Sequence, residues 1–401
     1  MTMITVEKEI KTSPGQVYYA LTHASMLTQW LCDLATVAPR PGGRMYLWWN
    51  GDFYSSGEYV SLEENRSIVF KWFGRSDPGS SPVTVILRPI NGHTLVSLTH
   101  SVPDDDEWKG LAESFKTEWT GSFENLASVL ETGKDLRIWN RPMIGISGFC
   151  DFNADIAKYM GVPVNEGARL DDLVEGMGAQ KAGLKKHDVI VQLAGKPITN
   201  DFNTFALAMQ GKKAGDVVEV IFYRGSEKMI TNMELTGRPD PNIPWDSKEL
   251  GRTLRLRYDE ALAALEKSLE GVSEADAEHR PALGEWNAKE TLAHLIHTER
   301  VWAFNLADSV GGFDRWADDW SGNIMAHVQA TVAAYPTIPA LLAELKANIT
   351  EVVAFTSNLP DSYLARKSAY LNNANVLLNI QSHILSHIEQ IRSAVESARK
   401  K

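Results

Sequence analysis

The chain has 401 residues, a formal net charge of −11 and only two cysteines, Cys32 and Cys150. This length exceeds one ordinary domain core, so we expect a multidomain protein. Without a basic block, nucleic acid is excluded as a partner. Two distant cysteines exclude a disulfide framework and a cysteine zinc site. No apolar run approaches the roughly 18 residues of a membrane span, and the first ten residues lack a signal peptide's apolar core. We therefore expect no membrane partner and a cytoplasmic location.

Residues 1–137 alternate in the way that β-strands do. We expect a strand at 5–11, a short helix opening at Ser13-Pro14 and a second short helix ending at Trp30. Further strands are predicted at residues 43–49, 57–62, 67–73, 83–87 and 94–100. An amphipathic helix is predicted at 105–131, and the sheet must wrap around it to bury its apolar stripe.

This order of elements resembles the START-like (SRPBCC) helix-grip fold and, within it, the Hsp90-ATPase-activator-like domains. The motifs that carry the resemblance are residues 4–10, Ser13-Pro14, 17–21, Trp30, Gly42-Gly43, 57–60 and 68–72. The resemblance implies an α+β domain with a cavity for a small hydrophobic ligand. The aromatic residues that could line this cavity are Trp49, Trp72, Trp119 and Phe123. Alternatively these four are ordinary core residues, and only the family name suggests chaperone activation.

Residues 138–240 read as mostly β. A strand is predicted at 188–192, a helix at 201–210, and a hairpin of residues 217–224 and 228–235 across Gly225-Ser226. Neither a Gly-x-Ser-x-Gly elbow nor a His-Glu-x-x-His motif occurs in the chain, and Ser147 lies in a predicted strand. We therefore do not expect a protease.

The second segment resembles the PDZ domains of HtrA-type proteases. The resemblance rests on Gly176 through Gly183-Leu184, on Asp188-Val-Ile and on 195–198, with Lys186-His187 departing from the family at a turn. It implies that a partner protein's C-terminal peptide adds as a strand. The implied peptide-binding residues are Met143, Ile144, Gly145 and Ile146 in the loop and Phe205 and Met209 on the helix. The alternative is that these apolar residues are core and the groove is closed.

Residues 245–401 are predicted to be all α. Long helices are expected at 247–269, 287–307, 338–359 and 373–399, with connections at 311–319 and 335–336 and a short helix near 322–334. They indicate a four-helix bundle. Asn287 and Glu290 have the spacing of a capping box.

Three histidines in the bundle have the spacing of a metal site. His383 and His387 are four residues apart and share a helix face, and His294 lies on another helix. Three imidazoles leave an open position on a metal, as in catalytic sites. A lone histidine pair is more often a surface or core feature.

The segment from Trp286 to His294, followed by His383-x3-His387, resembles the DinB-like metal-binding bundles. The resemblance implies a divalent metal ion, nickel or zinc, on His294, His383 and His387. His297 remains an alternative ligand or supporting group. Glu299 and Glu389 could support the ligands from outside, but we expect both glutamates to be solvated.

The resemblances together leave several functions open. The favoured one is a divalent-metal-dependent thiol transferase or hydrolase that acts on a small apolar substrate with a low-molecular-weight thiol. A non-enzymatic stress or adaptor protein that binds partner C-termini and a small hydrophobic ligand is the main alternative. A chaperone cofactor is the third.

Overall fold

A computed structural model describes residues 1–150, 152–201, 203–281, 285–313 and 324–400. Contacts divide the chain into two compact units: Met1–Lys134 with Pro241–Lys401, and Asp135–Asp240. The first unit contains the expected α+β domain and the expected helical region. Within the described ranges, no helix is both long enough and apolar enough to cross a membrane.

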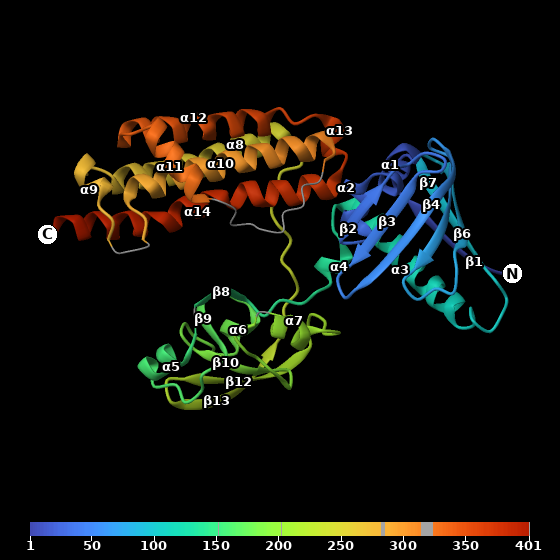
Figure 1. The fold of residues 1–401 in the computed structure, drawn as a ribbon, viewed down its shortest axis with the longest axis horizontal. Coiled ribbons are helices and arrows are strands. Elements are labelled where there is room, and N and C mark those ends of the chain that lie inside the picture. Colours follow the sequence, from blue (N-terminus) through green and yellow to red (C-terminus); the bar gives the residue numbers. More distant parts are fainter. Residues whose placement is uncertain (151, 202, 282–284, 314–323, 401) are drawn as a thin grey trace. The chain divides into compact units, whose positions relative to one another are not determined.

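Residues 1–134, all of them described, form one antiparallel sheet and the helices that pack on it (Figure 1). The strands are β1 (Thr2–Ile10), β2 (Leu34–Val37), β3 (Arg44–Trp49), β4 (Phe53–Glu63), β5 (Ser67–Gly74), β6 (Ser81–Ile90) and β7 (His93–Val102). They lie in the order β1-β7-β6-β5-β4-β3-β2. The helices are α1 (Pro14–Thr22), α2 (Ala24–Trp30) and α3 (Leu111–Thr132).

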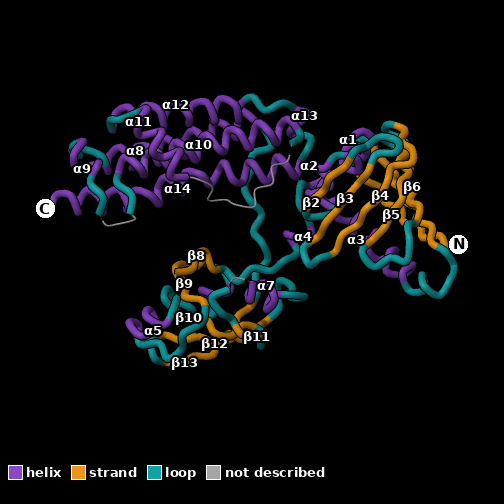
Figure 2. Tube along the Cα trace, in the orientation of Figure 1, coloured by secondary structure: helices purple, strands orange, loops and turns teal. Residues whose placement is uncertain are grey.

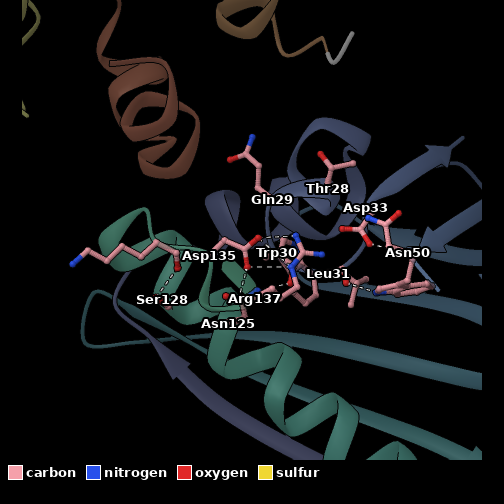
Figure 3. Close-up of polar contacts among 12 residues, drawn as sticks. Thr28, Gln29, Trp30, Leu31, Asp33, Asn50, Asn125, Ser128, Asp135 and Arg137 are labelled. Atoms are coloured by element: carbon pink, nitrogen blue, oxygen red, sulfur yellow. Dashed lines mark hydrogen bonds and ion pairs between the residues drawn. The ribbon is translucent and has the colours of Figure 1, made fainter. Parts of the chain in front are cut away.

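The core of this domain is formed by the inward-facing side chains of the sheet and the apolar face of helix α3. Every second residue of β7 is buried, because successive side chains of a strand point to opposite faces. The apolar stripe of α3 packs into the same core cluster. Asn125 on α3 donates from Nδ2 to the carbonyl oxygen of Trp30, 2.7 Å away, at the end of α2 (Figure 3). This bond satisfies a carbonyl that the helix end leaves open.

The long helix α3 begins later than the sequence predicted, at Leu111 rather than 105. Gly110 precedes it with a φ of 90°, a left-handed conformation that glycine adopts without strain. Trp108, just before this turn, is buried in the core. The predicted apolar helix is therefore present, but the residues predicted as its first turn form a loop in which Trp108 is buried.

Residues 135–240 contain a second sheet. Its described strands are β8 (Ile146–Cys150), β9 (Ala168–Leu173), β10 (Val189–Leu193), β11 (Lys196–Pro197), β12 (Val217–Arg224) and β13 (Glu227–Glu234). Their order is β13-β12-β10-β9-β8, with β11 paired to β10, so β8 lies at an edge. The described helices are α4 (Leu136–Trp139), α5 (Ala154–Met160), α6 (Gly178–Lys181) and α7 (Asn203–Met209).

Residues 241–400 are helical in their described part (Figure 2). The helices are α8 (Ser247–Ser268), α9 (Glu274–Glu278), α10 (Ala288–Gly311), α11 (Ile324–Ala334), α12 (Ile338–Ser357), α13 (Asp361–Leu364) and α14 (Lys367–Arg399). Among the four long helices, α8 and α10 each pack against both α12 and α14. The bundle is held by the apolar faces of these helices rather than by the intrinsic helix propensity of each one.

Two boundaries in the bundle differ from the prediction. Helix α14 begins at Lys367 and not at 373, and α10 continues to Gly311 instead of ending at 307. Asn373 looked like a helix start but lies inside α14, where its Nδ2 donates to the carbonyl oxygen of Ala369, 2.9 Å away. The predicted connection at 311–319 lies mostly outside the described residues, as does the start of the short helix predicted near 322.

Candidate metal centre

A doubly capped helix start fixes the first histidine of the candidate site. Asn287 Oδ1 accepts the Glu290 amide at 2.8 Å, and Glu290 Oε2 accepts the Asn287 amide at 3.0 Å. This is the predicted capping box. Arg280 also pairs with the Glu290 carboxylate. His294 lies four residues after Glu290, on the same face of α10. The capping box orders the first turn of this helix and so helps to fix the backbone that carries His294.

The other two histidines come from the middle of α14, which packs against α10. Because His383 and His387 are four residues apart on one helix, their side chains lie one above the other. The Nε2 atoms of His383 and His387 are 3.0 Å apart, and those of His294 and His383 are 3.1 Å apart. The structure therefore brings together all three histidines that the sequence selected, and one ligand atom from each lies within 4.8 Å of the others.

The three-histidine cluster is half-buried, and two of its members, His294 and His383, are uncharged near neutral pH. Burial above all, and then the neighbouring His383 and His387, lower the pKa of His294 to about 4. Burial and then His387 lower the pKa of His383 to about 4. Neutral imidazoles keep a lone pair on one ring nitrogen, which is the form that binds metal.

The geometry of this cluster fits a divalent ion. Nitrogens that each lie about 2.1 Å from one ion are separated by roughly 3.0 to 3.4 Å, depending on coordination number. The separations of 3.0 Å between His383 and His387 and of 3.1 Å between His294 and His383 fall in this range. Nδ1 of His294 is buried without a hydrogen-bond partner in the described structure. His294 would hold the ion through Nε2, and so would His383 and His387.

His297 does not join the cluster. Its ring stacks on that of His327, with centroids 4.6 Å apart and planes 29° apart. Burial lowers the pKa of His297, and the nearby His327 and Arg300 act in the same direction. Although His297 is one turn after His294, its ring contacts His327 on α11. The structure thus favours His294 over the alternative that the sequence left open.

One of the two glutamates expected in solvent is buried. Glu299 is 2% exposed, and its Oε2 accepts the hydroxyl of Tyr258 on α8 at 2.6 Å. Burial raises the pKa of Glu299 to about 7, and the Tyr258 hydrogen bond opposes this rise. The expectation that Glu299 is solvated was therefore wrong, because Tyr258 provides a partner in the core. Glu389 is exposed, as expected.

Two further residues contact the histidine rings. The indole of Trp286 lies 4.9 Å from the His294 ring between centroids, tilted by 55°. Gln390 Oε1 lies 2.7 Å from His387 Nδ1. From the sequence, Trp286 was recognised only as part of a motif, and no role was predicted for Gln390. A glutamine three residues after a histidine is on the same helix face, which was the one available indication.

Of the six residues selected for peptide binding, Met143 to Gly145 precede strand β8, Ile146 is its first residue, and Phe205 and Met209 lie on α7. Met143 forms an isolated bridge with Thr236, and Ile146 opens β8. Phe205 is buried in the core of this unit, and Ile144, Ile146 and Met209 pack against that core. Gly145 has a φ of 82°, and a Cβ there would lie 2.4 Å from the Cβ of Met177. Glycine is therefore required in this loop.

A hollow of about 410 Å³ lies further along β8. Of the six selected residues only Phe205 lines it. The other lining residues are Phe149, Cys150, Phe152, Asn153, Gly167, Ala168, Thr199 and Asn200. Sequence reasoning missed this end of the strand.

The aromatic core of the N-terminal domain leaves little space. Trp72, Trp119 and Phe123 line a cavity of about 20 Å³, which is room for one water molecule. Trp49 is not among its lining residues; its indole donates to the Leu31 carbonyl oxygen. In this structure the four selected aromatic residues pack as core, and binding of a hydrophobic ligand remains a prediction.

Comparisons with known protein families identify two of the three segments. Residues 11–131 match the family "Activator of Hsp90 ATPase homolog 1-like protein", and residues 257–391 match the DinB superfamily. The chain therefore contains an Hsp90-activator-homolog-like domain and, toward its C-terminus, a DinB domain.

Individual proteins resemble single parts of the chain. The Aha1 dimer from Colwellia psychrerythraea is 24% identical, and the match covers 33% of this chain and 99% of that one with a TM-score of 0.31. An HSP90 activator from Plasmodium falciparum is 27% identical over 33% of this chain and 97% of that one, with a TM-score of 0.29. The periplasmic endoprotease DegQ of Escherichia coli is 41% identical over 95 residues, 24% of this chain. The chain spans about a fifth of DegQ's length, since the match covers 20% of it.

Proposed function

We propose that the protein is a divalent-metal-dependent enzyme whose centre is formed by His294, His383 and His387. The observation that carries this proposal is that three imidazole Nε2 atoms, from two helices of the DinB-like domain, lie close together. Nickel or zinc matches an all-imidazole donor set. Such an ion would lower the pKa of a coordinated water or thiol toward neutrality. The reaction class that follows is transfer or hydrolysis on a small apolar molecule, with a low-molecular-weight thiol as co-substrate, in the cytoplasm.

The first test is metal content and thiol dependence. Elemental analysis of the purified full chain should give one nickel or zinc per protein, and His383→Ala should lose it. His327→Ala is the matched control, because His327 is an exposed histidine of the same bundle that contacts His297 and not the cluster. With cobalt as a spectroscopic substitute, added thiol should produce a sulfur-to-metal charge-transfer band. Stoichiometric metal without any thiol-dependent band would refute the thiol chemistry while leaving the metal site intact.

A second proposed function, peptide capture, belongs to residues 138–240 as a PDZ module. Strand β8 lies at a sheet edge, which can accept a further strand. No acceptor within the described residues takes the amide hydrogens of Ile144 or Gly145. Two such amides beside a glycine with positive φ are suited to a carboxylate. The partial likeness to DegQ supports the same assignment.

The peptide proposal is tested with a library of C-terminal peptides and the full chain. Binding should depend on a free terminal carboxylate, so the same peptides with amidated ends should bind at least about tenfold more weakly. If no member binds, or if amidation has no effect, the segment does not capture C-termini. In that event the adaptor alternative also loses its main support.

The N-terminal domain is proposed to deliver the small hydrophobic substrate. Entry of a ligand requires its core to open beyond the observed 20 Å³. A chaperone-cofactor role is the remaining alternative, and it rests on the names of similar proteins. Stimulation of an Hsp90-type ATPase by the full chain would support that alternative, and no stimulation would eliminate it.

A further inference from the structure

Gln390 contacts the candidate metal centre from the side opposite to the nitrogen cluster. It lies three residues after His387 on α14, and its Oε1 is 2.7 Å from His387 Nδ1. The other ring nitrogen, Nε2, is 3.0 Å from Nε2 of His383. Nδ1 of His387 thus contacts Gln390 on the same helix, and Nε2 of His387 contacts His383 in the cluster.

The chemistry of the two partners determines where the proton of His387 should be. A glutamine carbonyl oxygen can only accept a hydrogen bond, so this contact places the proton on Nδ1. The lone pair is then on Nε2, which faces His383. The opposite amide orientation would put the proton on Nε2 and block that nitrogen as a ligand.

We infer that Gln390 is a positioning residue, which holds His387 in the Nδ1–H tautomer and so presents its Nε2 lone pair to a divalent cation. This inference rests on the proposed metal site. It assigns a role that differs between the histidines, because Nδ1 of His294 is buried without a partner in the described structure. His387 is therefore the ligand that is oriented before the cation binds.

The chain offers a closely matched control. Glu389 is adjacent in sequence, but its side chain is 83% exposed and its nearest charged partner, Arg392, is 3.9 Å away. Glu389→Gln changes the charge at the surface of α14 without touching a histidine. Gln390→Leu removes the acceptor at similar volume, and Gln390→Glu restores an acceptor that binds the Nδ1–H more strongly.

Two measurements on the full chain test the inference. Zinc affinity, measured by chelator competition, should fall roughly 10- to 100-fold in Gln390→Leu, stay within about twofold in Glu389→Gln and be retained or increased in Gln390→Glu. Nitrogen-15 NMR of the metal-free protein should show His387 as the Nδ1–H tautomer in the wild type and a shift toward Nε2–H in Gln390→Leu. Thermal melts of each variant establish that it folds.

The outcomes separate this inference from the metal proposal. If the wild type binds no zinc, the proposed function fails, and the metal-free tautomer measurement still decides the role of Gln390. If the wild type binds zinc but Gln390→Leu binds it equally well, Gln390 has no positioning role. A wild-type His387 that carries its proton on Nε2 would overturn the inference by itself.

Discussion

The histidine cluster of the bundle and His100 of the N-terminal domain show opposite uses of the same buried side chain. His100 is fully buried, and burial lowers its pKa to about 4, as it does for His294. In the N-terminal domain, however, both ring nitrogens have protein partners: Ser81 Oγ lies 2.7 Å from Nε2, and the Trp119 indole donates to Nδ1 at 3.2 Å. In the bundle, the contacts of the Nε2 atoms with described residues are with one another.

Because His100 and His294 share burial and a lowered pKa but differ in the partners of their ring nitrogens, neither burial nor a lowered pKa identifies a functional histidine. Since Trp119 donates to His100 Nδ1, the proton of His100 is on Nε2 and is donated to Ser81. Ser81 is thus an acceptor and is not activated as a nucleophile. Among the described residues, no donor outside the cluster contacts its Nε2 lone pairs, and a cation would accept them.

The largest expected effect comes from His383→Ala. His383 Nε2 contacts the Nε2 atoms of both His294 and His387, so its loss leaves two imidazoles without the one between them. We expect zinc affinity to fall by more than about 100-fold, since losing a ligand costs more than losing a ligand's hydrogen-bond partner. Isothermal titration calorimetry measures this change. Stability without metal should barely change, and a large loss of stability would instead make His383 a structural residue like His100.

His100→Leu should have the reverse pattern. The substitution leaves the Ser81 hydroxyl and the Trp119 indole N–H buried without partners, and each costs roughly 1 to 3 kcal/mol. We expect a loss of about 4 kcal/mol in the free energy of unfolding, seen as a lower melting temperature, with unchanged zinc affinity. Weakened zinc binding in this variant would contradict the contrast between the two regions.

Glu299 extends the comparison to a buried carboxyl group. Its pKa is raised to about 7, whereas the unfolded chain has a value near 4.5. Between these values the folded state binds more proton than the unfolded state, so the stability of the bundle should fall as pH rises from 4.5 to 7. Glu299→Gln keeps an acceptor for Tyr258 and should remove this fall, a gain of about 3 kcal/mol at pH 8. Thermal melts at pH 5 and pH 8 measure it; equal pH slopes in both proteins would show that Glu299 is not the source.

The sequence predicted what depends on local periodicity. The i,i+4 spacing of His383 and His387 and the capping box of Asn287 are both properties of one helix, and both are found. The partner of Glu299 could not be predicted, because Tyr258 is 41 residues away and meets it only after the bundle packs. Gln390 was missed since its role depends on a side-chain rotamer rather than on its position. The aromatic residues of the N-terminal domain were recognised as a group from the sequence. The size of the cavity between them could not be predicted, because it depends on how side chains from different strands and helices pack.

The smallest expected effect tests whether the start of α10 matters to the histidine cluster. Asn287→Ala removes the cap that accepts the Glu290 amide, which should cost about 1 kcal/mol of stability. His294 is only two turns into the helix, so the first turn can fray in the metal-free state but must be ordered when zinc binds. The metal-bound state then bears more of the loss of about 1 kcal/mol than the metal-free state, and zinc binding should weaken by roughly two- to fivefold. Asn287→Ser retains a capping oxygen and should preserve both properties. If Asn287→Ala lowers stability and leaves zinc affinity unchanged, the lost cap costs the same in the metal-free and metal-bound states, and order at the start of α10 does not control the position of His294.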